Sequence, residues 1–159
     1  GAIREYFGAD WRLDPQKGRV IEPGHLEEWA WLLRQAGPLA TEAEATAEAL
    51  HRRAVTQGRR DGFLIREIDP SGATLDGGRR LWAQTEAVRT GLSFNDDGVA
   101  DLLHRILDTH LATDVPGLWI DSYEADGRSN DRAAPASSRS PSNSGANTLA
   151  PRLQTFTGS

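Results

Sequence analysis

The chain has 159 residues, of which 38% are hydrophobic, 26% are charged and none is Cys, and its net charge is −5. Without Cys there is no disulfide framework, thiolate metal site or thiolate nucleophile. The basic residues are scattered and no apolar run approaches a membrane span, so we expect a cytoplasmic protein that binds neither nucleic acid nor membrane.

The first expected helix carries the residues that say most about function. Residues 22–33 contain a Pro-Gly pair followed by His25, Glu28 and Trp29. Positions i, i+3 and i+4 share one helical face, so the imidazole, a carboxylate and an indole lie together. The helix is expected from about residue 25 to residue 36, because Gly37-Pro38 ends it.

This grouping permits proton transfer but does not require it. An imidazole titrates near neutral pH, and a neighbouring carboxylate can fix its tautomer, which suits a general base. The structural alternative is a capping or surface His, with Glu28 placed favourably in the helix dipole.

The second helix is expected from Thr41 to about Gln57, and Thr41 with Glu44 forms a capping-box pattern. Its apolar row is thin, which favours close helix packing. The row comprises Ala43, Ala47, Leu50 and Ala54.

A hairpin, two more helices and a strand are expected farther along the chain. The segment 62–78 contains an apolar run and an Asp-Pro-Ser-Gly turn, which indicate a short hairpin. Helices are expected at about 80–92 and 97–112, and a strand at 119–124. The apolar face of the second of these helices comprises Val99, Leu102, Leu103, Ile106 and His110. Helix pairs without βαβ alternation predict an all-α fold.

The composition changes near residue 138. The sequence from there to residue 159 is rich in Ser, Asn, Pro and Gly and has almost no apolar period. Such a segment cannot bury enough surface to offset the entropy of ordering, so we expect residues 138–159 to be disordered.

Four ordered motifs carry a resemblance to the N-acylglucosamine 2-epimerase family, which includes mannose isomerases and cellobiose 2-epimerases. They are Asp10-Trp11; the run 22–33, which has the form Glu-Pro-Gly-His-x-x-Glu-Trp-x-Trp-Leu-Leu; Trp82-Ala-Gln84-Thr-Glu86; and Gly117-Leu-Trp119-Ile-Asp121, followed by Asp126-Gly127 and Pro135-Ala-Ser137. The resemblance covers residues 1 to about 138.

The resemblance implies a fold and a division of the chain. It implies the C-terminal portion of an (α/α)6 barrel, in which short β-hairpins connect helix pairs. Residues 1–137 would form this partial catalytic domain. In the family, a Tyr-His pair follows the Pro-Ala-Ser motif, whereas this chain has no His after His110. We therefore expect residues 138–159 to be a frameshifted or non-native tail.

The resemblance also implies a reaction. Family enzymes move a proton between C1 and C2 of an open-chain sugar through an enediol, and they need no metal or cofactor. His25 would be the catalytic base, and Glu28, Trp82 and Glu86 would bind a monosaccharide or sugar phosphate of the mannose or N-acylglucosamine type. Because the second catalytic His is absent, we expect a weak or inactive enzyme.

The remaining His and Trp residues are given structural interpretations. The charged neighbours of His51 and His104 indicate surface positions, whereas His110 is expected to be packed or to interact with the C-terminal end of the helix dipole. Trp119 is expected in the core.

Two other functions stay open. The chain could be a non-catalytic remnant or a helix-pairing module that associates with itself or another chain through exposed helix faces. It could also be an α/α-barrel glycoside hydrolase, in which Glu28 and Glu86 would flank the glycosidic bond.

Overall fold

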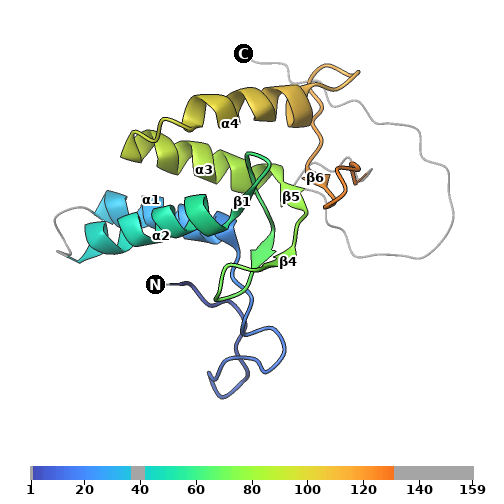
Figure 1. Ribbon diagram of the computed structural model, residues 1–159. Coiled ribbons are helices and arrows are strands. Elements are labelled where there is room, and N and C mark those ends of the chain that lie inside the picture. Colours follow the sequence, from blue (N-terminus) through green and yellow to red (C-terminus); the bar gives the residue numbers. More distant parts are fainter. Residues whose placement is uncertain (1, 37–41, 131–159) are drawn as a thin grey trace, which may run out of the picture.

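The computed structural model describes residues 2–36 and 42–130. Four α-helices and a π-helical turn lie in this part of the chain: α1 (Pro23–Ala36), α2 (Ala43–Gln57), α3 (Leu81–Phe94), α4 (Val99–Ile106) and η2 (Leu107–Leu111). Consecutive helices run in opposite directions and form stacked pairs (Figure 1). The expected order of helices is confirmed, while the tail from residue 138 lies outside the described residues.

Six short strands form three antiparallel pairs. Strand β1 (Arg59–Arg60) pairs with β2 (Phe63–Leu64), β3 (Glu67–Ile68) with β4 (Thr74–Asp76), and β5 (Arg79–Arg80) with β6 (Ser122–Tyr123). The labelled strands gather at the end of the helices where α3 begins (Figure 1). The expected hairpin is therefore confirmed as β3–β4, whereas the strand expected at 119–124 is confined to two residues.

The core lies where α1, α2 and α3 meet the strands. All four members of the small-residue row on α2 are buried, as are Leu26 and Ala30 of α1. The side chains of β2 and β3 close this core from the strand end: Phe63, Leu64 and Ile68. Small residues on α2 let its backbone approach α1, which explains the close pairing of these two helices.

The start of α2 differs from the capping-box expectation. Its N-cap is Glu42, whose side chain makes no capping hydrogen bond. Thr41 lies outside the described residues. The helix still places Glu44 in its first turn, where the positive end of the helix dipole favours a carboxylate.

The fourth expected helix changes geometry before its end. Regular α-helix stops at Ile106 and continues as η2 to Leu111. His110 is fully buried, and its Nδ1 donates a hydrogen bond to the carbonyl oxygen of Ile120 at 2.6 Å. The expectation of a packed His110 is confirmed, and this bond ties η2 to the loop before β6.

Two large apolar side chains expected inside are exposed instead. Trp119 is 40% exposed, which corrects its assignment to the core, and Leu103 of α4 is 44% exposed. On α1, Trp29 and Leu32 are also exposed. Several helices in the described part of the chain therefore present apolar surface that no described element covers.

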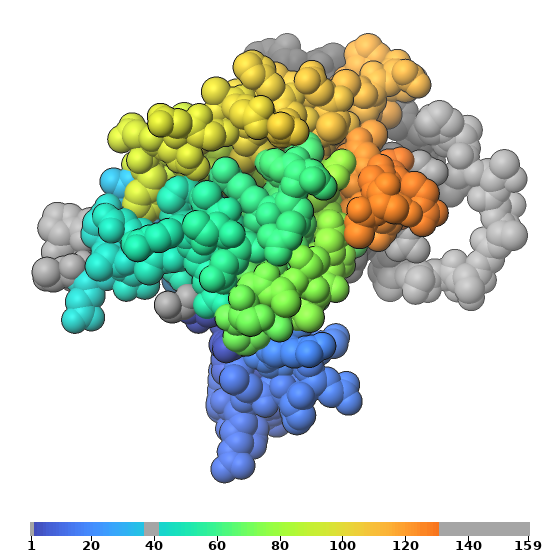
Figure 2. Space-filling view, viewed as in Figure 1, coloured from blue at the N-terminus to red at the C-terminus, as the bar shows by residue number. Residues whose placement is uncertain are grey.

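The N-terminal segment reaches the strand end of the helices before α1 begins. The middle of the blue N-terminal segment projects from the body of the molecule (Figure 2), whereas Val20 and Ile21 at its end are buried. Its last part is held by two backbone hydrogen bonds between Ile21 and Ile68, each 2.9 Å long. This attachment brings the segment to the first turn of α1. No helix among the described residues is long and apolar enough to cross a membrane.

Candidate active site at the start of helix α1

His25 occupies the first turn of α1 and is oriented by a residue far away in sequence. Its Nδ1 lies 2.8 Å from Oε1 of Glu5, and the His side chain is 33% exposed. A protonated Nδ1 donates to this carboxylate, which leaves Nε2 with a lone pair. His25 is therefore held in the tautomer that a general base requires.

A second carboxylate completes a small cluster. Oε2 of Glu22 lies 3.7 Å from the same Nδ1. The hydrogen bond that His25 donates to the Glu5 carboxylate raises the pKa of His25, although burial opposes this effect. Burial, followed by the charge of Glu5, raises the pKa of Glu22. The cluster thus stabilises an imidazolium, which favours uptake of a proton by His25.

Glu5, Glu22 and His25 could together hold a metal ion. The ligand atoms of Glu5, Glu22 and His25 all lie within 4.8 Å of one another. A metal on Nδ1 would replace the proton that His25 shares with Glu5. The sequence did not indicate this group, because Glu5 is twenty residues from His25. The expectation of a metal-free site stays a prediction.

Trp82 lies against His25 across the contact between α1 and α3. The ring centroids are 5.0 Å apart, with an interplanar angle of 36°. Gly24 makes this approach possible, because a Cβ there would lie 2.7 Å from Cη2 of Trp82 and 2.8 Å from Cβ of Ala83. The Pro-Gly pair before His25 thus serves helix packing as well as the start of α1.

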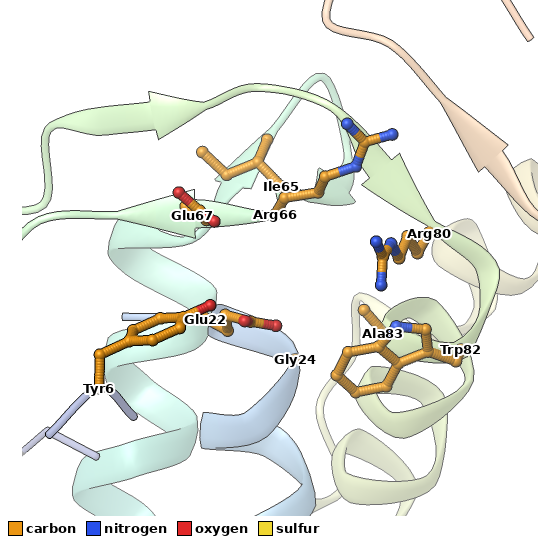
Figure 3. A pocket seen from close by; sticks show the side chains of 9 residues that line it. All are labelled: Tyr6, Glu22, Gly24, Ile65, Arg66, Glu67, Arg80, Trp82 and Ala83. Carbon is orange, nitrogen blue, oxygen red and sulfur yellow. The ribbon is translucent and has the colours of Figure 1, made fainter. Parts of the chain in front are cut away.

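A crevice of about 210 Å³ opens beside this cluster. Figure 3 shows Tyr6 and Glu22 on one side and Arg80 and Trp82 on the other. Arg66 and Glu67 also line it, whereas His25 does not. The crevice therefore lies next to His25, which is not among its lining residues. Trp82 contacts both.

Glu28 and Glu86 lie on facing helices, one turn beyond His25 and Trp82. Both are half-buried. Glu28 affects the pKa of His25 less than Glu5 and Glu22 do. Burial raises the pKa of Glu86, and the charge of Glu28 adds to this rise, while Arg89 opposes it. The four expected site residues thus lie along the α1–α3 contact, and their roles stay predictions.

Gln84, at the centre of the Trp-x-Gln-x-Glu motif, has a structural role. Its Oε1 accepts a 2.9 Å hydrogen bond from the Leu64 backbone N–H. Its Nε2 donates to the carbonyl oxygens of Leu64, at 2.9 Å, and of Arg80, at 3.1 Å. This fully buried amide fixes the start of α3 against β2 and so fixes the position of Trp82.

The assignment of His51 to the surface is wrong. The side chain of His51 is only 12% exposed, and its Nδ1 lies 2.7 Å from Oε2 of Glu27, which is completely buried. Its ring stacks on Phe94 at a centroid distance of 4.7 Å. Charged sequence neighbours misled the prediction, because they lie on other faces of α2. His104 is exposed, as expected.

The sequence matches a family model over most of its length. The model described as N-acylglucosamine 2-epimerase (GlcNAc 2-epimerase) matches residues 1–140. A protein named mannose-6-phosphate isomerase from Rhizobium meliloti (strain 1021) is 35% identical over 154 residues, which cover 86% of this chain and 39% of that protein. A cellobiose 2-epimerase from Bacteroides fragilis is 31% identical over 143 residues, which cover 80% of this chain and 35% of that protein.

Solved structures show the same fold. A D-mannose isomerase aligns with a TM-score of 0.64 at 19% identity, over 79% of this chain and 37% of its own. A sugar epimerase from a ruminal bacterium aligns with a TM-score of 0.66 at 20% identity, over 82% of this chain and 36% of its own. The chain thus spans less than two fifths of these relatives. It belongs to the N-acylglucosamine 2-epimerase family.

Proposed function

We propose that this chain carries part of the catalytic site of a sugar isomerase or 2-epimerase. The observation that carries the proposal is the His25–Glu5 pair, with Nδ1 and Oε1 at 2.8 Å, at the start of a helix whose motif matches the family. Nε2 of His25 would remove the proton beside the sugar carbonyl and return it to C1 or C2 of the enediol. Trp82 offers an apolar ring to a sugar face.

The proposed substrate is a mannose- or N-acylglucosamine-like sugar. The relatives named above act on mannose 6-phosphate, cellobiose and mannose by their names, and this range fits a reaction confined to C1 and C2. Glu28 and Glu86 would accept hydrogen bonds from the sugar hydroxyls. The four helices would form part of an (α/α)6 barrel, the architecture expected from the motifs.

The reaction that this site supports best uses one base. Transfer of the proton on a single face of a cis-enediol interconverts an aldose and a ketose with His25 alone. Epimerisation needs a second acid or base on the opposite face, and no His follows His110 in this sequence. We therefore expect isomerisation to exceed epimerisation, and both to be slow.

Product analysis tests this proposal. The chain is incubated with mannose, and fructose and glucose are separated and measured. We expect slow formation of fructose that His25→Ala abolishes and that His104→Ala, a change at an exposed His on α4, leaves unaltered. No fructose from the folded wild type would contradict the proposal and favour the non-catalytic, helix-pairing alternative. Equal rates in the wild type and His25→Ala would show that His25 is not the base.

A further inference from the structure

Arg89 lies between an aromatic ring of α1 and a carboxylate of α3. Its guanidinium group pairs with Oε2 of Glu86, one turn earlier on α3. The Cζ atom of Arg89 lies 4.0 Å from the ring centroid of Trp31, in cation–π geometry. The guanidinium group of Arg89 therefore has two partners, the Trp31 ring on α1 and the Glu86 carboxylate on α3.

The Arg89–Glu86 ion pair is partly buried, so water weakens it less than it weakens a fully exposed pair. The Arg89 side chain is 40% exposed and that of Glu86 is 20% exposed. Nε of Arg89 is buried and has no hydrogen-bond partner among the described residues. A solvated Arg–Glu pair on a helix surface contributes little, but a partly desolvated pair fixes the orientation of the carboxylate.

The charges around Glu86 have opposite effects on its pKa. Burial and the charge of Glu28 both favour its protonated form, and Arg89 is the cation that favours the carboxylate. A carboxylate accepts hydrogen bonds from hydroxyl groups more strongly than a protonated carboxyl does. Without Arg89, Glu86 would bind a proton more tightly and lose its fixed orientation.

We propose that Arg89 is a positioning residue for sugar binding: it directs the Glu86 carboxylate toward the hydroxyls of the sugar, and Trp31 holds Arg89 in place. The inference rests on the proposed function, because it takes the Glu28–Glu86 region as the sugar site. It adds a residue that the motifs do not contain and that touches neither sugar nor reacting atoms.

Three variants separate this role from a structural one. Arg89→Met removes the charge and keeps much of the side-chain volume, while Arg89→Lys restores the charge without the planar fork. Arg105→Met is the matched control, because Arg105 makes a helical pair with Asp101 at 2.7 Å on α4. For each variant, KM and kcat for mannose are measured between pH 5 and 8, and Glu86 is titrated by carboxyl 13C NMR with Glu86→Gln for assignment.

We expect Arg89→Met to raise KM about tenfold or more, with a much smaller change in kcat. The pKa of Glu86 should rise further, and the acid limb of kcat/KM should move to higher pH with it. Arg89→Lys should recover most of both effects, and Arg105→Met should show neither.

Two results would overturn the inference in distinguishable ways. An active wild-type chain whose KM and Glu86 pKa are unchanged in Arg89→Met would refute the role of Arg89 and leave the proposed function intact. A wild-type chain that neither binds nor converts sugars, although the Glu86 pKa responds to Arg89→Met, would refute the proposed function and the sugar-binding role with it.

Discussion

The two His–carboxylate pairs that each have one member on α1 differ in exposure, and this difference suits them to different roles. His25 is partly open to solvent and pairs with Glu5, while His51 is nearly enclosed and pairs with the fully buried Glu27. A base must reach its substrate, so the first pair suits chemistry. The second pair, whose carboxylate is completely buried, joins elements of the fold, here α1 and α2.

Loss of the Glu5 carboxylate should change the pH dependence of proton transfer. The hydrogen bond to Glu5 raises the pKa of His25 above 6.5, and the base is active only when unprotonated, so the rate rises with pH through this pKa. In Glu5→Gln the pKa falls, and the acid limb of kcat should move to lower pH. The maximal rate should fall by roughly tenfold or more, because the ring loses its fixed tautomer.

The measurement is the pH–rate profile of mannose conversion, with Glu48→Gln on the exposed face of α2 as the control. An acid limb at the same pH in Glu5→Gln and in the wild type would show that Glu5 does not act on His25.

Removal of His51 should destabilise the chain in a pH-dependent way. Burial raises the pKa of Glu27, and His51 partly offsets this effect. In His51→Ala an ionised Glu27 would remain buried without its partner at neutral pH, at a cost of about 3–5 kcal/mol. Below its raised pKa the carboxyl binds a proton, so the loss should shrink as the pH falls through that pKa.

Urea unfolding followed by the helical circular dichroism signal at pH 5 and pH 7.5 tests this prediction. His104→Ala serves as the control for removing an exposed His. An equal loss of stability at both pH values in His51→Ala would mean that Glu27 is not the group left without a partner.

The contact between α1 and α3 depends on one glycine. A methyl group at Gly24 would lie within 3.0 Å of two ring atoms of Trp82 and of the Ala83 methyl group. Gly24→Ala should therefore push α3 away from α1 and cost about 1–3 kcal/mol, although Gly→Ala changes at unstrained helical positions usually stabilise. Thermal melting measures the loss, and an unchanged or higher melting temperature would contradict the described packing.

The helices were predictable because their signals are local. Apolar spacing and the breakers Gly37-Pro38 located α1 to α4 to within a few residues. The change to π-helix at Leu107 and the short β6 were missed; here His110 bonds to the carbonyl oxygen of Ile120, and β6 pairs with β5. Such a bond between segments ten residues apart leaves no periodic signal in the sequence.

The site was predictable only in part, for the same reason. His25, Glu28, Trp82 and Glu86 follow from helical spacing and family motifs, and the structure places them along one helix contact. Glu5 reaches His25 through the path of residues 2–22, which no helical or strand period describes. The inward direction of His51 likewise follows from how α2 packs, not from its neighbours in sequence.

The molecule as a whole exposes apolar surface on two sides. Trp29 is 48% exposed on α1, and Leu107 and Leu111 are each 45% exposed at the other side, where they continue the row of Leu103. Each large side chain left in water forgoes roughly 1.5–3 kcal/mol of burial, against a typical stability of about 5–15 kcal/mol. We expect the isolated 159-residue chain to associate or to pack loosely.

Size-exclusion chromatography with light scattering, together with thermal melting, tests this prediction. Replacing Leu103 and Leu107 together by Lys should reduce association if these faces mediate it. A monodisperse monomer with a sharp, cooperative melting transition would contradict the expected behaviour.

Exchange of the C2 proton of mannose in heavy water tests the central claim most directly, because it detects proton removal even when little product forms. The account predicts that the wild-type chain incorporates deuterium at C2, that the rate rises with pH through the pKa of His25, and that His25→Gln abolishes the incorporation. Incorporation that persists in His25→Gln, or none in a folded wild-type chain, would contradict the assignment of His25 as the base.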